Sequence, residues 1–139
     1  MSFQYSRRVY LGDTDAAGVV YFAKGMEICH EAYEESLASS DISLEQMLAD
    51  KKVALPIVRA EIDFLRPMFC GDRIIICLTT DLINSSEFIV NYQIFYIVYL
   101  DKILVQAKTN HDSIDPAKRI RIDIPITMLN WLKTDEIKI

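Results

Sequence analysis

The sequence predicts an α+β domain in which a curled antiparallel sheet packs on one long helix. Apolar residues recur at helical spacing over residues 20–37, and from Leu55 onward they alternate with a period of two in segments separated by short turns. Short turns between successive strands require antiparallel pairing, because a parallel connection needs a dozen or more residues. The 139 residues contain four Gly and four Pro and no stretch typical of a linker. We therefore expect residues 1–139 to form a single domain.

The first half of the chain predicts one strand followed by two helices. Residues 4–11 form the expected strand. Residues 20–37 would form an amphipathic helix about 27 Å long, with an apolar stripe made of Phe22, Met26, Cys29, Tyr33 and Leu37. A shorter helix is expected over residues 43–50, where Ser43 can cap the N-terminus and Gln46 stands at capping-box spacing.

The second half predicts four strands joined by tight turns. Residues 56–64 alternate apolar with polar side chains, as expected of a half-buried strand. A turn at 70–72 leads into the next strand, which contains Ile74, Ile76 and Leu78. A turn at 84–85 then precedes a long strand over 86–100. A hairpin at 101–102 joins this strand to the last one, over 103–114. One end of the long strand is apolar on both faces, which indicates that another subunit covers it; the residues concerned are Phe95, Ile97 and Tyr99.

The composition is that of a globular, acidic protein. Hydrophobic residues make up 51% of the chain and charged residues 25%, which excludes a disordered chain and a collagen-like repeat. Fifteen Lys and Arg against twenty Asp and Glu give a formal net charge of −5. Because such a chain has no overall positive field, we expect neither nucleic acid nor an anionic membrane surface as a partner.

The sequence also indicates the compartment. No stretch approaches the roughly 20 apolar residues that span a bilayer, and residues 1–8 lack the apolar core of a signal peptide. The cysteines, Cys29, Cys70 and Cys77, are odd in number and show no C-x-x-C pairing, so neither a disulfide framework nor a zinc site is expected. The sequence therefore predicts a soluble, cytoplasmic protein.

The segment over residues 12–22, between the first strand and the long helix, is the candidate for chemistry. The first turn of the helix exposes N–H groups near Tyr21 and Phe22 that can stabilise an oxyanion. Asp15 could reach the same carbonyl as a nucleophile or as the base for a water, and Gly18 allows close approach of the backbone to a ligand. A plainer interpretation is that the acidic residues and Thr14 only form a turn and a helix cap.

A family resemblance favours the catalytic interpretation. The run GDTDAAGVVYFAK at residues 12–24, followed by an amphipathic helix, resembles the signature of hotdog-fold acyl-CoA thioesterases related to 4-hydroxybenzoyl-CoA thioesterase. The resemblance extends through AEIDFLRP at residues 60–67 and Gly71-Asp72, so it covers most of the chain. It implies a hotdog fold, a curled antiparallel sheet wrapped around one long helix.

The resemblance also implies a set of site residues. It places the catalytic carboxylate on Asp15 and the backbone N–H that polarises the thioester carbonyl on Phe22, with substrate-binding positions at Gly18, Val19, Val20 and Tyr21. It implies an acyl-CoA substrate, no metal and no organic cofactor. It further implies assembly as homodimers or as homotetramers built from dimers, with active sites at subunit interfaces.

Within this family the chain most resembles the cyanobacterial 1,4-dihydroxy-2-naphthoyl-CoA hydrolases of phylloquinone biosynthesis. Residues 55–58 and 60–72 carry this closer resemblance. The activity that it implies is hydrolysis of 1,4-dihydroxy-2-naphthoyl-CoA to 1,4-dihydroxy-2-naphthoate and CoA. The alternatives are a thioesterase acting on 4-hydroxybenzoyl-CoA or a short-chain acyl-CoA, and a noncatalytic module that binds acyl-CoA.

A basic stretch near the C-terminus could meet the phosphates of CoA. Lys118, Arg119 and Arg121 stand within four residues of one another in an otherwise acidic chain. Taken without the resemblance, the stretch could equally be a solvated loop. Given an acyl-CoA substrate, we expect it to bind phosphate, either in its own subunit's site or in that of a neighbour.

Other reactive side chains receive structural roles. Glu31 on the helix is the rival carboxylate to Asp15, but the aspartate of the loop makes a second one unnecessary. His30 fits a charge network on the polar face of the helix, and His111 is assigned no chemistry. Cys29 and Cys77 are expected in the core as small hydrophobes. Packing is also the role expected of the strand tyrosines Tyr92, Tyr96 and Tyr99.

Overall fold

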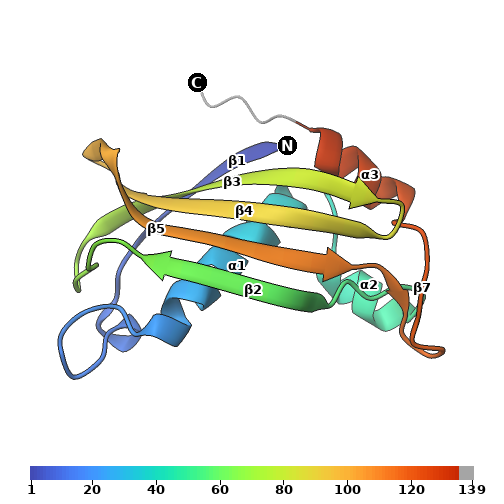
Figure 1. Ribbon diagram of the computed structural model, residues 1–139, viewed down its shortest axis with the longest axis horizontal. Helices are drawn as coiled ribbons and strands as arrows, with labels where there is room; N and C mark the ends of the chain where they lie inside the picture. Colours follow the sequence, from blue (N-terminus) through green and yellow to red (C-terminus); the bar gives the residue numbers. More distant parts are fainter. Residues whose placement is uncertain (135–139) are drawn as a thin grey trace.

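The computed structural model describes residues 1–134 and shows a sheet wrapped around a long helix (Figure 1). Helix α1 spans Phe22–Ser39, α2 spans Leu44–Asp50, and α3 spans Ile126–Lys133. The strands are β1 (Ser2–Arg8), β2 (Ile57–Phe64), β3 (Arg73–Asn84), β4 (Glu87–Tyr96), β5 (Tyr99–Asp112), β6 (Ile114–Asp115) and β7 (Ile120–Arg121), with a short 3-10 helix at Leu11–Asp13. Among these residues no helix combines the length and apolar character needed to cross a membrane.

The sheet has five antiparallel strands in the order β1-β3-β4-β5-β2, so β1 and β2 are its edges. Helix α1 lies across the inner face, behind the sheet in Figure 1. Strands β6 and β7 form a separate hairpin. The α+β architecture predicted from the two periodicities is therefore present.

The core lies between α1 and the inner face of the sheet. Ile28, Cys29 and Leu37 of the helix are fully or almost fully buried, and they meet the alternate residues of the central strands, which are Ile74, Ile76, Leu78, Phe88, Val90, Tyr92 and Ile94. The capping expected at α2 is also present, because the Ser43 hydroxyl accepts a hydrogen bond from the N–H of Gln46 at 3.1 Å.

The helical stripe differs from the predicted one at its start. Phe22 is the first residue of α1 and is 65% exposed, so its ring does not belong to the core. Gly25, Ile28, Ala32 and Ser36 face the sheet together with the predicted Cys29, Tyr33 and Leu37. The first turn of α1 is therefore at the surface of the molecule, where Phe22 is exposed to solvent.

The predicted strand over 86–100 runs too far at its C-terminal end, because β4 ends at Tyr96. The chain turns at Ile97 and Val98, and Tyr96 pairs with Tyr99 across this turn. Residues 101–102, predicted as the hairpin, lie within β5. The doubly apolar end of the strand is thus a hairpin tip, where Val98 is 77% exposed. The alternation of apolar residues runs on through the turn, so the pattern alone does not reveal the reversal.

Strand β2 is more exposed than the half-buried strand predicted from its alternation. Seven of its eight residues are exposed and only Ile62 is partly buried. The reason is its place at the edge of the sheet, where it pairs with β5 on one side alone. Its other side presents unpaired backbone groups flanked by the exposed apolar residues Val58, Phe64 and Leu65.

Two parts of the chain depart from the predicted elements near the ends. The first strand stops at Arg8 because Leu11–Asp13 form a 3-10 turn. Helix α3 is an element that the sequence reasoning missed; it begins after Pro125 and buries Met128, Trp131 and Leu132. The signal that could have revealed it is the apolar spacing of these three residues directly after a proline.

Candidate active site

The loop between β1 and α1 folds back on itself as a tight hairpin. The N–H of Asp15 donates to the carbonyl of Val19 at 2.9 Å, and the N–H of Gly18 donates to the carbonyl of Asp15 at 3.0 Å. Gly18 has a φ of 83°, a left-handed conformation that favours glycine. These bonds fix the position of Asp15 just before the helix.

The carboxylate of Asp15 stays accessible within this hairpin. Its Oδ1 accepts a hydrogen bond from the N–H of Ala17 at 2.8 Å, and the side chain is partly exposed. This bond is the turn contact that the plainer interpretation predicts. Asp15 does not cap α1, however, because the N-cap residue is Tyr21. The turn therefore uses one carboxylate oxygen of Asp15, and Asp15 is not a helix cap.

The N-terminus of α1 has no side-chain cap. Tyr21 makes no side-chain capping bond, and the first turn contains no acidic residue. The N–H of Tyr21 donates to the carbonyl of Asp13 at 2.9 Å, while the structure of residues 1–134 assigns no acceptor to the N–H of Phe22. The positive end of the helix dipole and an unused donor are thus available to an external oxygen.

Asp15 and the first turn of α1 line the same cavity, which has a volume of about 360 Å³. One wall comes from the loop and the helix start, through Asp15, Val19, Val20, Tyr21 and Phe22. The other wall comes from the segment that follows β2, through Phe64, Leu65, Arg66, Pro67 and Met68. Besides Asp15, the sequence predicted five site positions, from Gly18 to Phe22, and four of them line the cavity. Gly18 lies in the turn and does not line it.

The second wall was missed by residue-level reasoning. It is joined to the loop by backbone pairing, because the N–H of Val20 donates to the carbonyl of Met68 at 2.9 Å and Val19 bridges Phe69. These two segments are almost fifty residues apart in the chain. The only sequence signal for them was the AEIDFLRP run, which the family resemblance singled out without assigning it a role.

Glu31 is engaged away from this cavity. Its Oε2 accepts hydrogen bonds from the Tyr5 hydroxyl at 2.8 Å and from Arg7 Nη1 at 3.2 Å. The same guanidinium donates through Nη2 to the buried carboxylate of Asp13. Burial, together with the bond to Glu31, raises the pKa of Tyr5 to about 12. Glu31 therefore helps to hold the loop against β1 and α1 and is not placed as a second carboxylate beside Asp15.

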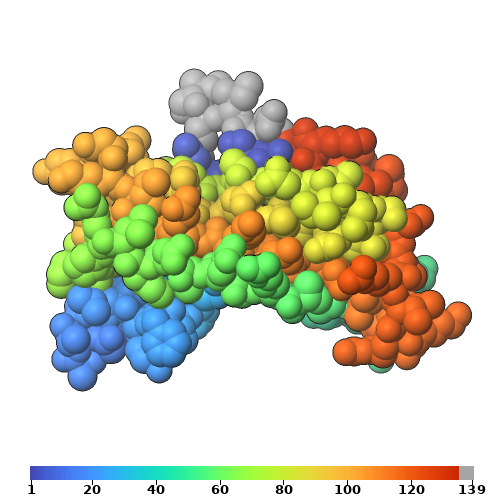
Figure 2. Space-filling model, viewed as in Figure 1, coloured from blue at the N-terminus to red at the C-terminus, as the bar shows by residue number. Residues whose placement is uncertain are grey.

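The basic stretch lies at the opposite end of the molecule from Asp15. Lys118 and Arg119 belong to the turn of the β6–β7 hairpin, and Arg121 in β7 forms an ion pair with Asp112 at 3.5 Å. Figure 2 shows this hairpin (orange) and the loop before α1 (blue) at the two ends of one face. A single chain does not bring the predicted phosphate-binding residues to its own Asp15.

The remaining reactive side chains have structural surroundings. His30 pairs with Glu34 at 3.2 Å on the helix surface. His111 is fully buried, which lowers its pKa to about 4, and its Nε2 lies 2.9 Å from the Thr109 hydroxyl. Burial raises the pKa of the Cys29 thiol to about 12, so the thiolate form needed of a nucleophile is disfavoured.

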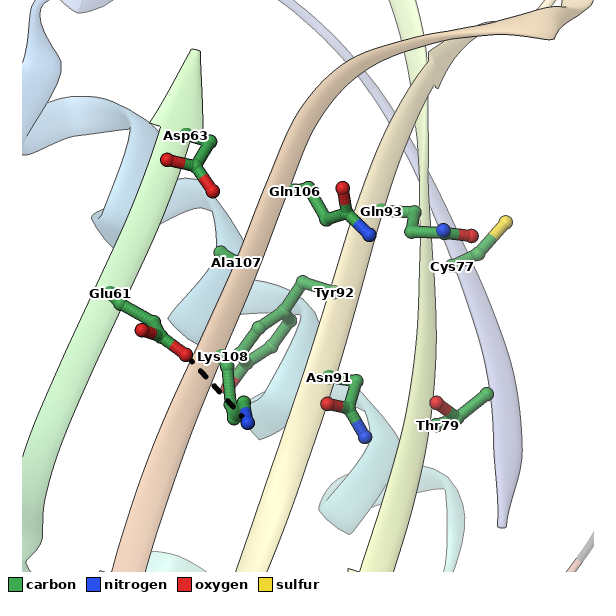
Figure 3. A pocket seen from close by; sticks show the side chains of 10 residues that line it. All are labelled: Glu61, Asp63, Cys77, Thr79, Asn91, Tyr92, Gln93, Gln106, Ala107 and Lys108. Carbon is green, nitrogen blue, oxygen red and sulfur yellow. Dashed lines mark ion pairs between the residues drawn. The ribbon is translucent and has the colours of Figure 1, made fainter. Parts of the chain in front are cut away.

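A larger hollow, of about 560 Å³, lies on the outer face of the sheet and is separate from the site (Figure 3). Its lining is mostly polar and includes the ion pair between Glu61 and Lys108 at 3.7 Å. Cys77 also lines it, so the prediction that this cysteine lies in the core is wrong. Neither Asp15 nor a helix terminus faces this hollow, and its size alone does not make it a reaction site.

Comparisons with known proteins show which proteins this chain resembles in sequence and fold. Residues 9–132 match the family model described as the thioesterase-like superfamily. The chain is 48% identical over 132 residues to a 1,4-dihydroxy-2-naphthoyl-CoA hydrolase from Rippkaea orientalis, covering 95% of this chain and 96% of the relative. It is 51% identical over 129 residues to the hydrolase of that name from Microcystis aeruginosa, covering 92% and 91%. The crystal structure of a 1,4-dihydroxy-2-naphthoyl-CoA thioesterase from Synechocystis superposes with a TM-score of 0.91 at 38% identity, covering 95% and 96%.

Proposed function

The chain belongs to the thioesterase-like superfamily, with the hotdog fold, and on this basis we propose that it hydrolyses 1,4-dihydroxy-2-naphthoyl-CoA to 1,4-dihydroxy-2-naphthoate and CoA. The relatives that carry this name match nearly the whole chain at about half identity. The single structural observation that supports the proposal is the shared cavity, because it joins the carboxylate of Asp15 to the open N-terminus of α1.

In the proposed reaction the thioester carbonyl lies between these two groups. Asp15 either attacks the carbonyl carbon, forming an anhydride that water then cleaves, or takes a proton from a water molecule that attacks this carbon. The carbonyl oxygen gains negative charge, which the N–H of Phe22 and the helix dipole stabilise. The C–S bond then breaks, CoA leaves as the thiol after gaining a proton, and the acyl group leaves as the carboxylate with one oxygen from water.

The acyl group fits the cavity by its chemistry. Val19, Val20, Phe64, Pro67 and Met68 offer mainly apolar surface next to Asp15. An aromatic acyl group buries apolar area against such a lining, and a cavity of about 360 Å³ falls in the range of small-ligand sites. The same surface would serve a 4-hydroxybenzoyl group, so substrate turnover must decide between the two.

The proposal includes assembly into homodimers, or tetramers built from them. Strand β2 is a sheet edge with exposed Ile57, Val58 and Phe64, and such an edge is normally covered. Pairing of β2 with a second copy would bury this edge beside the cavity. In such an assembly, Lys118, Arg119 and Arg121 bind the CoA phosphates at the site of another subunit, since they lie far from their own Asp15.

We also propose that the enzyme acts in the cytoplasm. Cys29 and Cys70 are free thiols, and Cys70 is exposed. An exposed thiol persists in a reducing compartment, whereas it is readily oxidised in a secreted protein.

A turnover panel tests the proposed function. The purified chain is assayed with 1,4-dihydroxy-2-naphthoyl-CoA, 4-hydroxybenzoyl-CoA, benzoyl-CoA and acetyl-CoA, and release of the CoA thiol is followed. We expect the highest kcat/KM for the naphthoyl substrate. A preference for 4-hydroxybenzoyl-CoA or acetyl-CoA would reassign the substrate, and saturable CoA binding without thiol release from any thioester would indicate a noncatalytic module.

A further inference from the structure

Helix α1 contains a glycine that its backbone does not require. Gly25 is buried in the first turns of the helix, and only Gly18 and Gly71 among the glycines have positive φ. Glycine is less favourable than alanine inside a helix, because it loses more conformational freedom on folding. A compensating reason for Gly25 must therefore lie in what surrounds it.

The surroundings of Gly25 are the ring of Phe64. A Cβ atom at position 25 would lie 2.6 Å from Cε1 and 2.8 Å from Cζ of that ring, and 3.3 Å from Cδ1 of Ile62. The first two distances are far inside normal van der Waals contact. The Phe64 ring therefore rests directly on the helix backbone, in a place that any side chain at position 25 would occupy.

The position of this ring affects the candidate active site. Phe64 lines the cavity that contains Asp15 and Phe22, and it is 43% exposed, so one side of the ring faces open space. Cδ1 of Ile62 lies 3.3 Å from the same Cβ position, so the space next to Gly25 is bounded by Ile62 as well as by the ring. Because Phe64 is part of the cavity wall, displacement of its ring from the helix would change the width of the cavity.

We propose that Gly25 is a specificity-determining residue, which keeps the cavity wide enough for a bicyclic aromatic acyl group by letting Phe64 lie against α1. This inference rests on the proposed thioesterase function. Gly25 itself does not touch the acyl group; it acts through Phe64. The proposal assigns discrimination between bicyclic and monocyclic acyl groups to the contact between these two residues.

The test is the substitution Gly25→Ala. The measured quantity is the ratio of kcat/KM for 1,4-dihydroxy-2-naphthoyl-CoA to that for benzoyl-CoA. We expect this ratio to fall about tenfold, since a single methylene in an apolar pocket changes discrimination by at least about that factor. The melting temperature is measured alongside, because the helix preference of alanine raises stability while displacement of the ring lowers it. Ser39→Ala, at the exposed far end of the same helix, is the matched control and should leave the ratio unchanged.

A double-mutant cycle separates an effect of Gly25→Ala through the Phe64 ring from a general effect on the packing of the helix. Phe64→Leu removes the two ring atoms that the new methyl would meet. Adding Gly25→Ala to Phe64→Leu should therefore change the ratio far less than adding it to the unmodified chain. An equal loss in both backgrounds would trace the effect to the helix and overturn the proposal, as would an unchanged ratio in the folded Gly25→Ala variant.

Binding measurements keep the inference distinct from the proposed function. Calorimetry gives the affinities of the unmodified chain and the Gly25→Ala variant for ketone analogues of the two thioesters, in which a methylene replaces sulfur. If the unmodified chain binds these analogues without hydrolysing either thioester, the proposed function fails. The affinity ratio of the analogues then still tests the role of Gly25, and its insensitivity to Gly25→Ala would overturn that role.

Discussion

The N–H of Tyr21 donates to the main-chain carbonyl of Asp13 at 2.9 Å, which ties the residue before α1 to the loop that carries Asp15. The carboxylate of Asp13 is held in turn by Arg7 and by the N–H of Tyr10. One buried aspartate thus joins β1, the loop and the helix start. The orientation of the Phe22 N–H relative to Asp15 depends on this junction.

Arg7→Met should therefore weaken both the fold and the site. Removing one partner of a largely buried ion pair leaves the carboxylate of Asp13 uncompensated, at a cost of about 3 kcal/mol. Urea unfolding measures this loss, and kcat should fall more than KM rises because Asp13 positions the loop. Arg7→Lys should recover part of both effects. Unchanged unfolding of Arg7→Met would show that the ion pair does not hold the loop.

Asp15→Asn should abolish most turnover and keep the fold. The amide oxygen of asparagine can still accept the hydrogen bond from Ala17, so the turn survives while the charge is lost. Loss of the nucleophile or base should lower kcat by at least about 10²-fold. Asp41→Asn, a change of the same kind at an exposed position just after α1, should leave kcat unchanged. Near-normal hydrolysis by Asp15→Asn would reject the proposed catalytic role.

Charge reversal in the β6–β7 turn should raise KM. The double substitution Lys118→Glu and Arg119→Glu replaces attraction for the CoA phosphates with repulsion, and kcat should change little because the chemistry lies elsewhere. Initial-rate kinetics at low salt measure the effect, and Lys133→Glu in α3 is the control. Arg121 is left intact in this test because it pairs with the buried Asp112. A KM equal to that of the unmodified chain would remove phosphate binding from this turn.

The stability of the fold should fall in acid through His111. Burial lowers its folded pKa to about 4 from an ordinary value of 6.5, so in the window between these values the unfolded chain binds the proton and the folded chain does not. Stability is then fully present above about pH 6.5 and is lost as the pH falls toward 4 and below, by on the order of 3 kcal/mol in all. Urea unfolding at pH 4 to 7 measures the slope.

His111→Gln supplies the comparison for that slope. Glutamine does not titrate and can still reach the Thr109 hydroxyl, which lies 2.9 Å from the histidine ring. The variant should be less stable at pH 7 because ring packing against Phe88 is lost, but its stability should depend less on pH. An identical pH dependence in the variant would place the acid sensitivity elsewhere.

Val58→Lys should weaken subunit assembly. Val58 is exposed on the edge strand β2, and a charged residue at a sheet edge disfavours pairing with another strand. Sedimentation velocity should show a lower mass for this variant than for the unmodified chain at equal concentration. Leu48→Lys, at an exposed position of α2 away from the sheet edge, should keep the original mass. Equal masses for both variants would exclude the β2 edge as the contact.

The sequence predicted the fold best where one periodicity is strong and uninterrupted. Helix α1 and strand β3 follow directly from apolar spacings of that kind, and both are present. The hairpin at Ile97-Val98 was not predicted, since both turn residues are apolar and continue the alternation. Asp101-Lys102 has the composition of a turn but lies within β5, where the pairing with β4 shifts its register. Tertiary register therefore overrides local turn propensity at this point.

The candidate site was predictable on one side only. Asp15 and the start of α1 are neighbours in the sequence, so a loop followed by a helix brings them together with no further information. Phe64 and Met68 join them through the pairing of Val20 with Met68, which connects distant segments and has no periodic signature. The space that Gly25 leaves for Phe64 is likewise visible only when α1 and β2 are in contact.

The separation between the Asp15 loop and the Lys118–Arg121 turn has a genetic consequence. If each reaction centre takes its carboxylate from one copy and its cations from another, two differently damaged chains can rescue each other. An Asp15→Asn chain mixed with a chain carrying Lys118→Glu and Arg119→Glu would form hybrid assemblies. In these assemblies, one active site would combine the intact Asp15 of one chain with the intact Lys118 and Arg119 of the other. Catalysis would then return in a blend of two proteins that are each deficient when alone.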